Sequence, residues 1–345
     1  MSNPDPHPTD TVCLGDPAVD GLLSPREVPL GGPRAMTVRR TLPHREISLI
    51  GAWCFCDHYG PDDVAETGGM HVARHPHTGL ATVSWLFSGG VDHLDSTGGR
   101  ARIEPGDLAL MAAGRGITHQ EISTPETEVL HGVQLWYALP DATRHGDPGL
   151  QEYTAPPVEL EGGEARVFIG SLLGSTSPVE TWTEGLVGAE IRLGAGAEVT
   201  VPVDPAFEHG LLMDSGELAV RAAGASEGGA DEHVVPDGHL LHLAVGREEL
   251  VLRAGPEGAR LVLIGGVPLG EEIVMFWNFV GRSHEEVASF RARYQRELGF
   301  EPGEPTDTPV PLVADEVDLF GPWPEGQPEP LPAPNLPNAR LRPRG

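Results

Sequence analysis

The fold is decided by residues 69–122, which begin GMHVARHPHTGL and end AGRGITHQEI. This stretch consists of short apolar runs separated by clusters of turn-forming residues, such as SGG at residues 88–90 and PGD at residues 105–107. Apolar runs of this length that are bounded by Gly, Pro and Asp are typical of antiparallel strands joined by tight turns. The sequence therefore predicts an all-β fold around this stretch.

Two triplets within this stretch carry potential metal ligands, HPH at residues 75–77 and HQE at residues 119–121. Residues i and i+2 of a strand project from the same face, so each triplet offers two ligands to one side of a sheet. Two such pairs facing each other across a barrel would suit iron, nickel, copper or zinc. The chain has 15 His, so one triplet could arise by chance, but a second paired triplet favours a metal site. The candidate ligands are His75, His77, His119 and Glu121.

The strand that carries His75 and His77 leads directly into the apolar run at residues 80–87. If the alternation of faces continues, the side chains on the imidazole face are Ala81, Val83, Trp85 and Phe87. We therefore expect an apolar wall beside the imidazoles. Because Pro76 cannot donate a ladder hydrogen bond, we expect the first triplet at a strand start, an edge or a bulge.

Several motifs together resemble the signature of the pirin family. They are HPHxG at residues 75–79, PGD at 105–107, MxAGRGIxHxE at 111–121 and QLW at 134–136, with DHYGP upstream at 57–61. The resemblance is dense in the first half of the chain and thins in the second. It implies a bicupin, with two tandem cupin (double-stranded β-helix) barrels and one iron in the N-terminal barrel. It also implies that the ligands are His75, His77, His119 and Glu121, with Fe(II) as the expected metal and Ni, Cu, Zn or Mn as alternatives.

The chain departs from the pirin pattern at two places. Ala81 stands where cupins usually have a glutamate, which puts hydrogen bonding around the ligands in doubt. Residues 277–282, WNFVGR, replace a Gly-Pro-Phe-Val-Met-Asn segment of the family, so we expect the wall supplied by that segment to differ.

Composition narrows the class of protein. The chain has 345 residues and carries 23 Lys+Arg against 51 Asp+Glu, a net charge of −28, which disfavours binding to nucleic acid or to anionic membranes. No apolar run is long enough to span a membrane, and residues 1–20 show no signal-peptide pattern. Three Cys fit a reducing cytoplasm, and we expect Cys54 and Cys56 to be structural rather than metal ligands. We expect a cytoplasmic monomer.

The predicted organisation follows from the periodicity and the Pro- and Gly-rich breaks. Residues 283–298 form the predicted helix, with a capping box at Ser283 and Glu286, a buried apolar stripe and Gly299 as the C-cap. We expect residues 310–320 to dock in extended form. The predicted segments are an N-terminal arm (1–34), a metal-binding barrel (35–140), a linker (141–157), a second barrel without metal (158–282), a helix (283–299) and a Pro-rich tail (300–345).

Some finer expectations concern loops and the remaining histidines. Residues 47–50 are a candidate strand, and residues 57–67 are a candidate loop over the barrel mouth. We expect His58 and His71 to be hydrogen-bonded structural residues close to the site, and His93 and His131 to be ordinary strand residues. In the second barrel, residues 207–210 (FEHG) lack a same-face pair of histidines, so no metal is expected there.

The resemblance implies a flavonol (quercetin) dioxygenase-type oxidoreductase, with a small aromatic substrate and with Glu121 as the ligand able to accept the substrate proton. The alternative within the family is a non-catalytic, redox-responsive regulator that binds a protein partner. A sugar-handling bicupin or isomerase would need charged residues on the barrel wall, and the predicted apolar wall argues against it.

Overall fold

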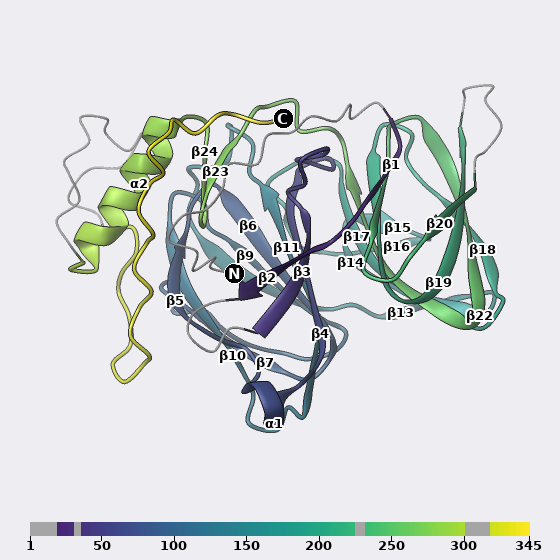
Figure 1. The fold of residues 1–345 in the computed structure, drawn as a ribbon, viewed down its shortest axis with the longest axis horizontal. Helices are drawn as coiled ribbons and strands as arrows, with labels where there is room; N and C mark the ends of the chain where they lie inside the picture. Colours follow the sequence, from purple (N-terminus) through teal and green to yellow (C-terminus); the bar gives the residue numbers. More distant parts are fainter. Residues whose placement is uncertain (1–18, 31–35, 225–231, 301–317) are drawn as a thin grey trace.

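The computed structural model describes residues 19–30, 36–224, 232–300 and 318–345. Two β-barrels lie side by side, and a helix packs on the side of the first barrel that faces away from the second (Figure 1). The C-terminal segment starts beside this helix and runs across the first barrel toward the second. The prediction of an all-β bicupin with a C-terminal helix is confirmed.

The first barrel is formed by two antiparallel sheets. Its strands are β2 (Arg26–Leu30), β3 (Met36–Leu42), β4 (Trp53–Asp63), β5 (His71–His77), β6 (Leu80–Ser88), β7 (Val91–Asp95), β8 (Arg100–Ile103), β9 (Asp107–Ala112), β10 (Ile117–Ser123), β11 (Val129–Ala138) and β12 (Gly149–Thr154). One sheet has the order β12-β9-β6-β11-β4-β3-β2, and the other has the order β5-β10-β7-β8. The two triplets that carry the candidate ligands thus lie on neighbouring strands, β5 and β10, of the smaller sheet.

The second barrel repeats this plan within one nine-stranded sheet. Its strands are β1 (Gly21–Leu23), β13 (Pro157–Leu160), β14 (Gly163–Ile169), β17 (Leu186–Leu193), β18 (Glu198–Pro202), β19 (Glu208–Gly224), β20 (Glu232–Val235), β21 (Leu240–Leu243) and β22 (Arg247–Gly266). Two small hairpins accompany the barrels, β15 (Ser171–Leu172) with β16 (Ser175–Thr176) and β23 (Val274–Phe276) with β24 (Phe279–Gly281). Strand β1 pairs with β21 and β2 pairs with β3, so the N-terminal segment contributes a strand to each barrel.

The predicted apolar wall beside the imidazoles is wrong. Ala81, Val83, Trp85 and Phe87 lie in a buried cluster between the barrels, where Trp85 Nε1 donates to Glu190 Oε2 at 2.8 Å. The alternation breaks at Gly79, whose φ of +67° turns the chain from β5 in one sheet into β6 in the other. Parity counted through a turn between sheets does not hold, because each sheet sets its own inward face. Ala81 therefore lies in the core between the barrels.

Two loop predictions also need correction. Residues 47–50 make only an isolated bridge, between Ile50 and Trp53, and not a strand. Most of the predicted loop at residues 57–67 belongs to β4, which pairs with β11 and β3, and it ends in the short helix α1 (Val64–Thr67). Its Asp57 is fully buried and accepts two hydrogen bonds from Arg40, at 2.6 and 2.8 Å.

Helix α2 (His284–Glu297) forms as its sequence predicts. Ser283 is the N-cap and accepts from Glu286 N at 3.1 Å, and Gly299 follows the C-cap with a φ of +72°. Its buried residues Val287, Phe290 and Tyr294 pack against β23 and β24 and against Phe320 of the C-terminal segment. None of the helices in the described residues is long and apolar enough to cross a membrane.

The C-terminal segment, residues 318–345, lies along the first barrel and α2 (yellow in Figure 1). Its Phe320 carbonyl accepts hydrogen bonds from Arg74 and from Thr118 Oγ1, and Gln120 Nε2 donates to Gln327 Oε1 at 2.7 Å. These contacts are made by the outward neighbours of His75 and His119. Most of the stretch predicted to dock, residues 310–317, lies outside the described residues.

Candidate metal centre

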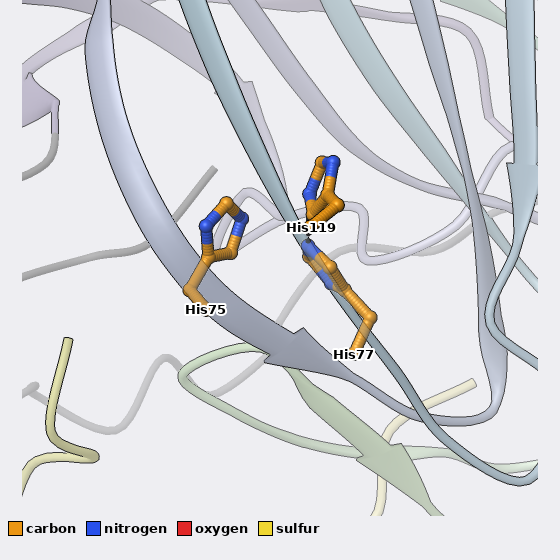
Figure 2. Close-up of side chains that lie close together, drawn as sticks. All are labelled: His75, His77 and His119. Atoms are coloured by element: carbon orange, nitrogen blue, oxygen red, sulfur yellow. Dashed lines mark hydrogen bonds between the residues drawn. The ribbon is translucent and has the colours of Figure 1, made fainter. Parts of the chain in front are cut away.

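Three histidines converge inside the first barrel (Figure 2). His75 and His77 project from β5 and His119 from β10, because the ladder pairs His119 with His75 and Ile117 with His77. The ring centroids are 4.3–5.0 Å apart, and His77 Nε2 lies 3.0 Å from His119 Nε2. All three side chains are fully buried.

The electrostatics keep these imidazoles neutral, as a metal ligand requires. Burial lowers the pKa of His75, His77 and His119 well below the ordinary value. His75 Nδ1 lies 2.8 Å from the Ala73 carbonyl oxygen, which fixes the proton on Nδ1 and leaves Nε2 as a lone pair without a partner. A buried lone pair without a partner is costly unless a ligand uses it.

Glu121 lies on the same strand as His119, and its carboxylate lies near His119 and His93. Its ligand atoms and those of His119 and His93 lie within 4.8 Å of one another, and the ladder is irregular between His119 and Glu121. Glu121 Oε1 accepts from Ser84 Oγ at 2.7 Å, whereas Glu121 Oε2 is buried without a partner. The carboxylate is thus held by β6 with one oxygen still available.

His93 was missed by the sequence analysis, which treated it as an ordinary strand residue. It lies on β7, next to β10, and His93 Nδ1 is 3.3 Å from His119 Nδ1. Asp95 shares its face and lies 3.4 Å away, measured from His93 Nε2 to Asp95 Oδ2. The i, i+2 spacing of His93 and Asp95 was the available signal, but only the pairing of β7 with β10 shows that it concerns His119.

Aromatic and amide groups line the interior near the histidines. The Trp136 ring meets the His77 ring edge-on at 5.0 Å and stacks on Phe55 at 3.9 Å. Trp136 Nε1 and Gln134 Nε2 are buried without partners, as are both polar side-chain atoms of Asn278. Asn278 belongs to the segment that departs from the family, and this segment packs beside Thr78 through a bridge to Phe279.

The donor set fits a divalent first-row metal. The imidazoles of His75, His77 and His119 converge in a buried interior, and Glu121 lies in an adjoining group with His93 and His119. His75 Nε2 and Glu121 Oε2 have no hydrogen-bond partner and are atoms that such a metal accepts as ligands. The assignment of His75, His77, His119 and Glu121 as the four ligands stays a prediction. The two buried thiols are poor alternatives, because burial raises the pKa of Cys54 and of Cys56 to about 12.

A second histidine cluster joins the two barrels. Asp214 Oδ1 of β19 lies 2.7 Å from both His58 Nε2 of β4 and His131 Nε2 of β11, and Asp214 Oδ2 accepts from Arg260 Nε at 2.5 Å. Arg39 also lies 3.2 Å from His58 Nε2. Because guanidinium groups already contact the atoms that a cation would need, this cluster is an ion-pair network. His58 is structural, as predicted, and His131 belongs to the same network, whereas His71 is exposed.

The second barrel has apolar side chains at the positions that correspond to the candidate ligands of the first. Strand β22 lies between β18 and β19, just as β10 lies between β5 and β7. Matching these ladders places Val201 at the position of His75, Val220 at His93, Leu250 at His119 and Leu252 at Glu121. All four side chains are buried in the second barrel's core. The absence of metal from this barrel stays a prediction, and these residues agree with it.

The chain matches known proteins over most of its length. Residues 35–137 match the Pirin family and residues 188–300 match the Pirin C-terminal cupin domain. A Pseudomonas aeruginosa protein named "Putative quercetin 2,3-dioxygenase PA1205" is 37% identical over 301 residues, covering 85% of this chain and 91% of that protein. Pirin from Homo sapiens is 31% identical over 255 residues, covering 73% of this chain and 83% of that protein.

A solved structure is also similar to this chain over most of its length. The crystal structure of quercetin 2,3-dioxygenase from Acinetobacter baumannii has a TM-score of 0.78 and 32% identity, covering 94% of this chain and 97% of that one. The matches span both barrels of this chain. The chain therefore belongs to the pirin family.

Proposed function

We propose that this protein is a metal-dependent oxygenase of flavonol-type substrates, with its centre at His75, His77, His119 and Glu121. The observation that carries the proposal is the convergence of three buried, neutral imidazoles beside a carboxylate oxygen that has no other partner. The substrate class is supported by the names of two similar proteins, both of which include quercetin 2,3-dioxygenase. Imidazole nitrogens and a carboxylate oxygen suit Fe(II), as they suit other divalent transition metals. Such a metal would supply a site that lowers the pKa of a substrate hydroxyl and orients O₂ beside it.

The residues of the chain have defined tasks in this proposal. Glu121 Oε2 is the group that would accept the proton of a substrate hydroxyl, with Ser84 Oγ holding the other oxygen at 2.7 Å. Trp136 presents an aromatic ring next to His77, with Phe55 stacked on it, in place of the predicted apolar wall that included Trp85 and Phe87. Gln134 Nε2 offers a free donor for a substrate oxygen.

One observation favours a second function, a redox-responsive regulator that binds a protein partner. The candidate ligands are at most 1% exposed, so a flat three-ring substrate reaches them only if the enclosing segments move. A regulator needs no such access, because a change of metal charge acts through the surrounding strands. We expect a monomer in either case.

The deciding experiment is oxygen uptake with quercetin by iron-loaded wild type, Glu121→Ala and metal-free protein. Glu126→Ala, which changes an exposed glutamate after β10, is the matched control. We expect uptake by wild type and Glu126→Ala, and a loss of at least about tenfold in Glu121→Ala, which removes both a ligand and the base. If metal-loaded wild type consumes no more oxygen than metal-free protein, flavonol oxygenation is excluded and the regulator takes its place.

A further inference from the structure

We propose that His93 and Asp95 are positioning residues that fix His119 as a metal ligand through a carboxylate–imidazole–imidazole chain. The proposal rests on the metal centre proposed above and adds two residues that lie outside its four ligands. It is carried by three contacts in series: His119 to His77 at 3.0 Å, His119 to His93 at 3.3 Å and His93 to Asp95 at 3.4 Å.

The contacts determine where each proton lies. His119 presents Nε2 to the convergence point shared with His77, so as a neutral ligand it carries its proton on Nδ1. His119 Nδ1–H then donates to His93 Nδ1, which leaves the His93 proton on Nε2. His93 Nε2–H faces Asp95 Oδ2, an acceptor. No other pair of neutral tautomers satisfies both contacts while leaving His119 Nε2 free.

Asp95 is held rigidly enough to anchor this chain. Its Oδ1 accepts from Thr97 N at 2.8 Å, Thr97 Oγ1 at 2.6 Å and Gly99 N at 3.0 Å, which leaves Oδ2 for His93. The turn has no room for a larger residue, because a Cβ on Gly99 would lie 2.2 Å from Asp95 Oδ2. Asp95 is 1% exposed and His93 is 4% exposed, so water does not compete for these contacts.

This series of hydrogen bonds makes His119 chemically different from His75. The Nδ1 of His75 faces a neutral backbone carbonyl, whereas His119 is connected through His93 to a carboxylate. Partners of this kind around a metal ligand orient the ring and raise its basicity. His119 is therefore a stronger donor than His75.

Two substitutions test the hydrogen bonds from Asp95 through His93 to His119 and leave all four proposed ligands unchanged. His93→Phe removes both ring nitrogens and keeps an aromatic ring. Asp95→Asn keeps the shape, but its amide can donate to His93 Nε2, which moves the His93 proton to Nδ1, against the Nδ1–H of His119. His71→Gln, which changes an exposed histidine on β5, is the matched control, and His119→Ala is the control for loss of a ligand.

The readouts are metal content by elemental analysis, Co(II) affinity by competition with a chelator and the visible absorption of the Co(II) form. We expect both substitutions to retain one metal per chain, to weaken affinity about 10–100-fold and to shift the Co(II) bands, whereas His71→Gln matches wild type. Wild-type affinity and spectra in both variants would show that His93 only packs. Loss of metal in His93→Phe as complete as in His119→Ala would make His93 a ligand. If the wild type binds no metal, the proposed metal centre is refuted, and with it the proposed hydrogen-bond chain from Asp95 to His119.

Discussion

Asp214→Asn tests whether the ion-pair network between the barrels stabilises the fold. Asp214 is 3% exposed and accepts hydrogen bonds from both His58 and His131, and it also pairs with Arg260. Burial by itself would raise the pKa of Asp214, but hydrogen bonds from His131 and His58 outweigh it and hold the pKa below its ordinary value. The group is thus charged at neutral pH, and the asparagine keeps its shape while it removes the charge.

The expected loss is about 3 kcal/mol. Removal of one partner of a buried ion pair costs about 3–5 kcal/mol, because the remaining charge stays buried without compensation. The lower end applies here, because the Arg260 side chain is 23% exposed and stays partly hydrated. His58 leaves no uncompensated charge, because burial lowers its pKa and keeps the fully buried imidazole neutral at the pH of the assay.

Urea unfolding at pH 7.5 measures this loss. With an m-value of about 3 kcal/mol/M, the unfolding midpoint should fall by about 1 M. Asp237→Asn, which changes an exposed aspartate of the same barrel, should change the free energy of unfolding by less than about 0.5 kcal/mol. A change of less than about 0.5 kcal/mol in Asp214→Asn, or an equal loss in both variants, would refute the reasoning.

Three further predictions concern single residues. His77→Ala should abolish stoichiometric metal in elemental analysis, and full retention would remove it from the ligand set. Burial lowers the pKa of His209 from 6.5 to about 4, so the unfolded chain takes up this proton first and stability falls as the pH drops from 6.5 to 4. His209→Gln should therefore retain roughly 3 kcal/mol more stability than wild type at pH 4, measured by urea unfolding at pH 7.5 and pH 4. Gly79→Ala should destabilise by about 1–3 kcal/mol more than Gly98→Ala, because both have positive φ but only the Gly79 Cβ would meet another atom, the Val280 oxygen at 2.3 Å; equal thermal shifts would contradict this.

The sequence determined the features that depend on alternation within one strand. His75 and His77 share a face because a strand repeats every two residues, and this holds wherever the strand lies in the fold. The cap at Ser283 and the buried stripe of α2 are equally local, since they follow from contacts three and four residues apart. The family motifs added what spacing could not, namely that the two triplets meet in the first barrel.

Tertiary structure decided everything that depends on which strands become neighbours. Trp85 faces the second barrel rather than the histidines because β5 and β6 belong to different sheets. His93 reaches His119 only because β7 pairs with β10. His58 and Asp214 lie 156 positions apart in the chain and meet because the barrels pack against each other. Local periodicity contains no information about such contacts, because they are set by the packing of whole sheets.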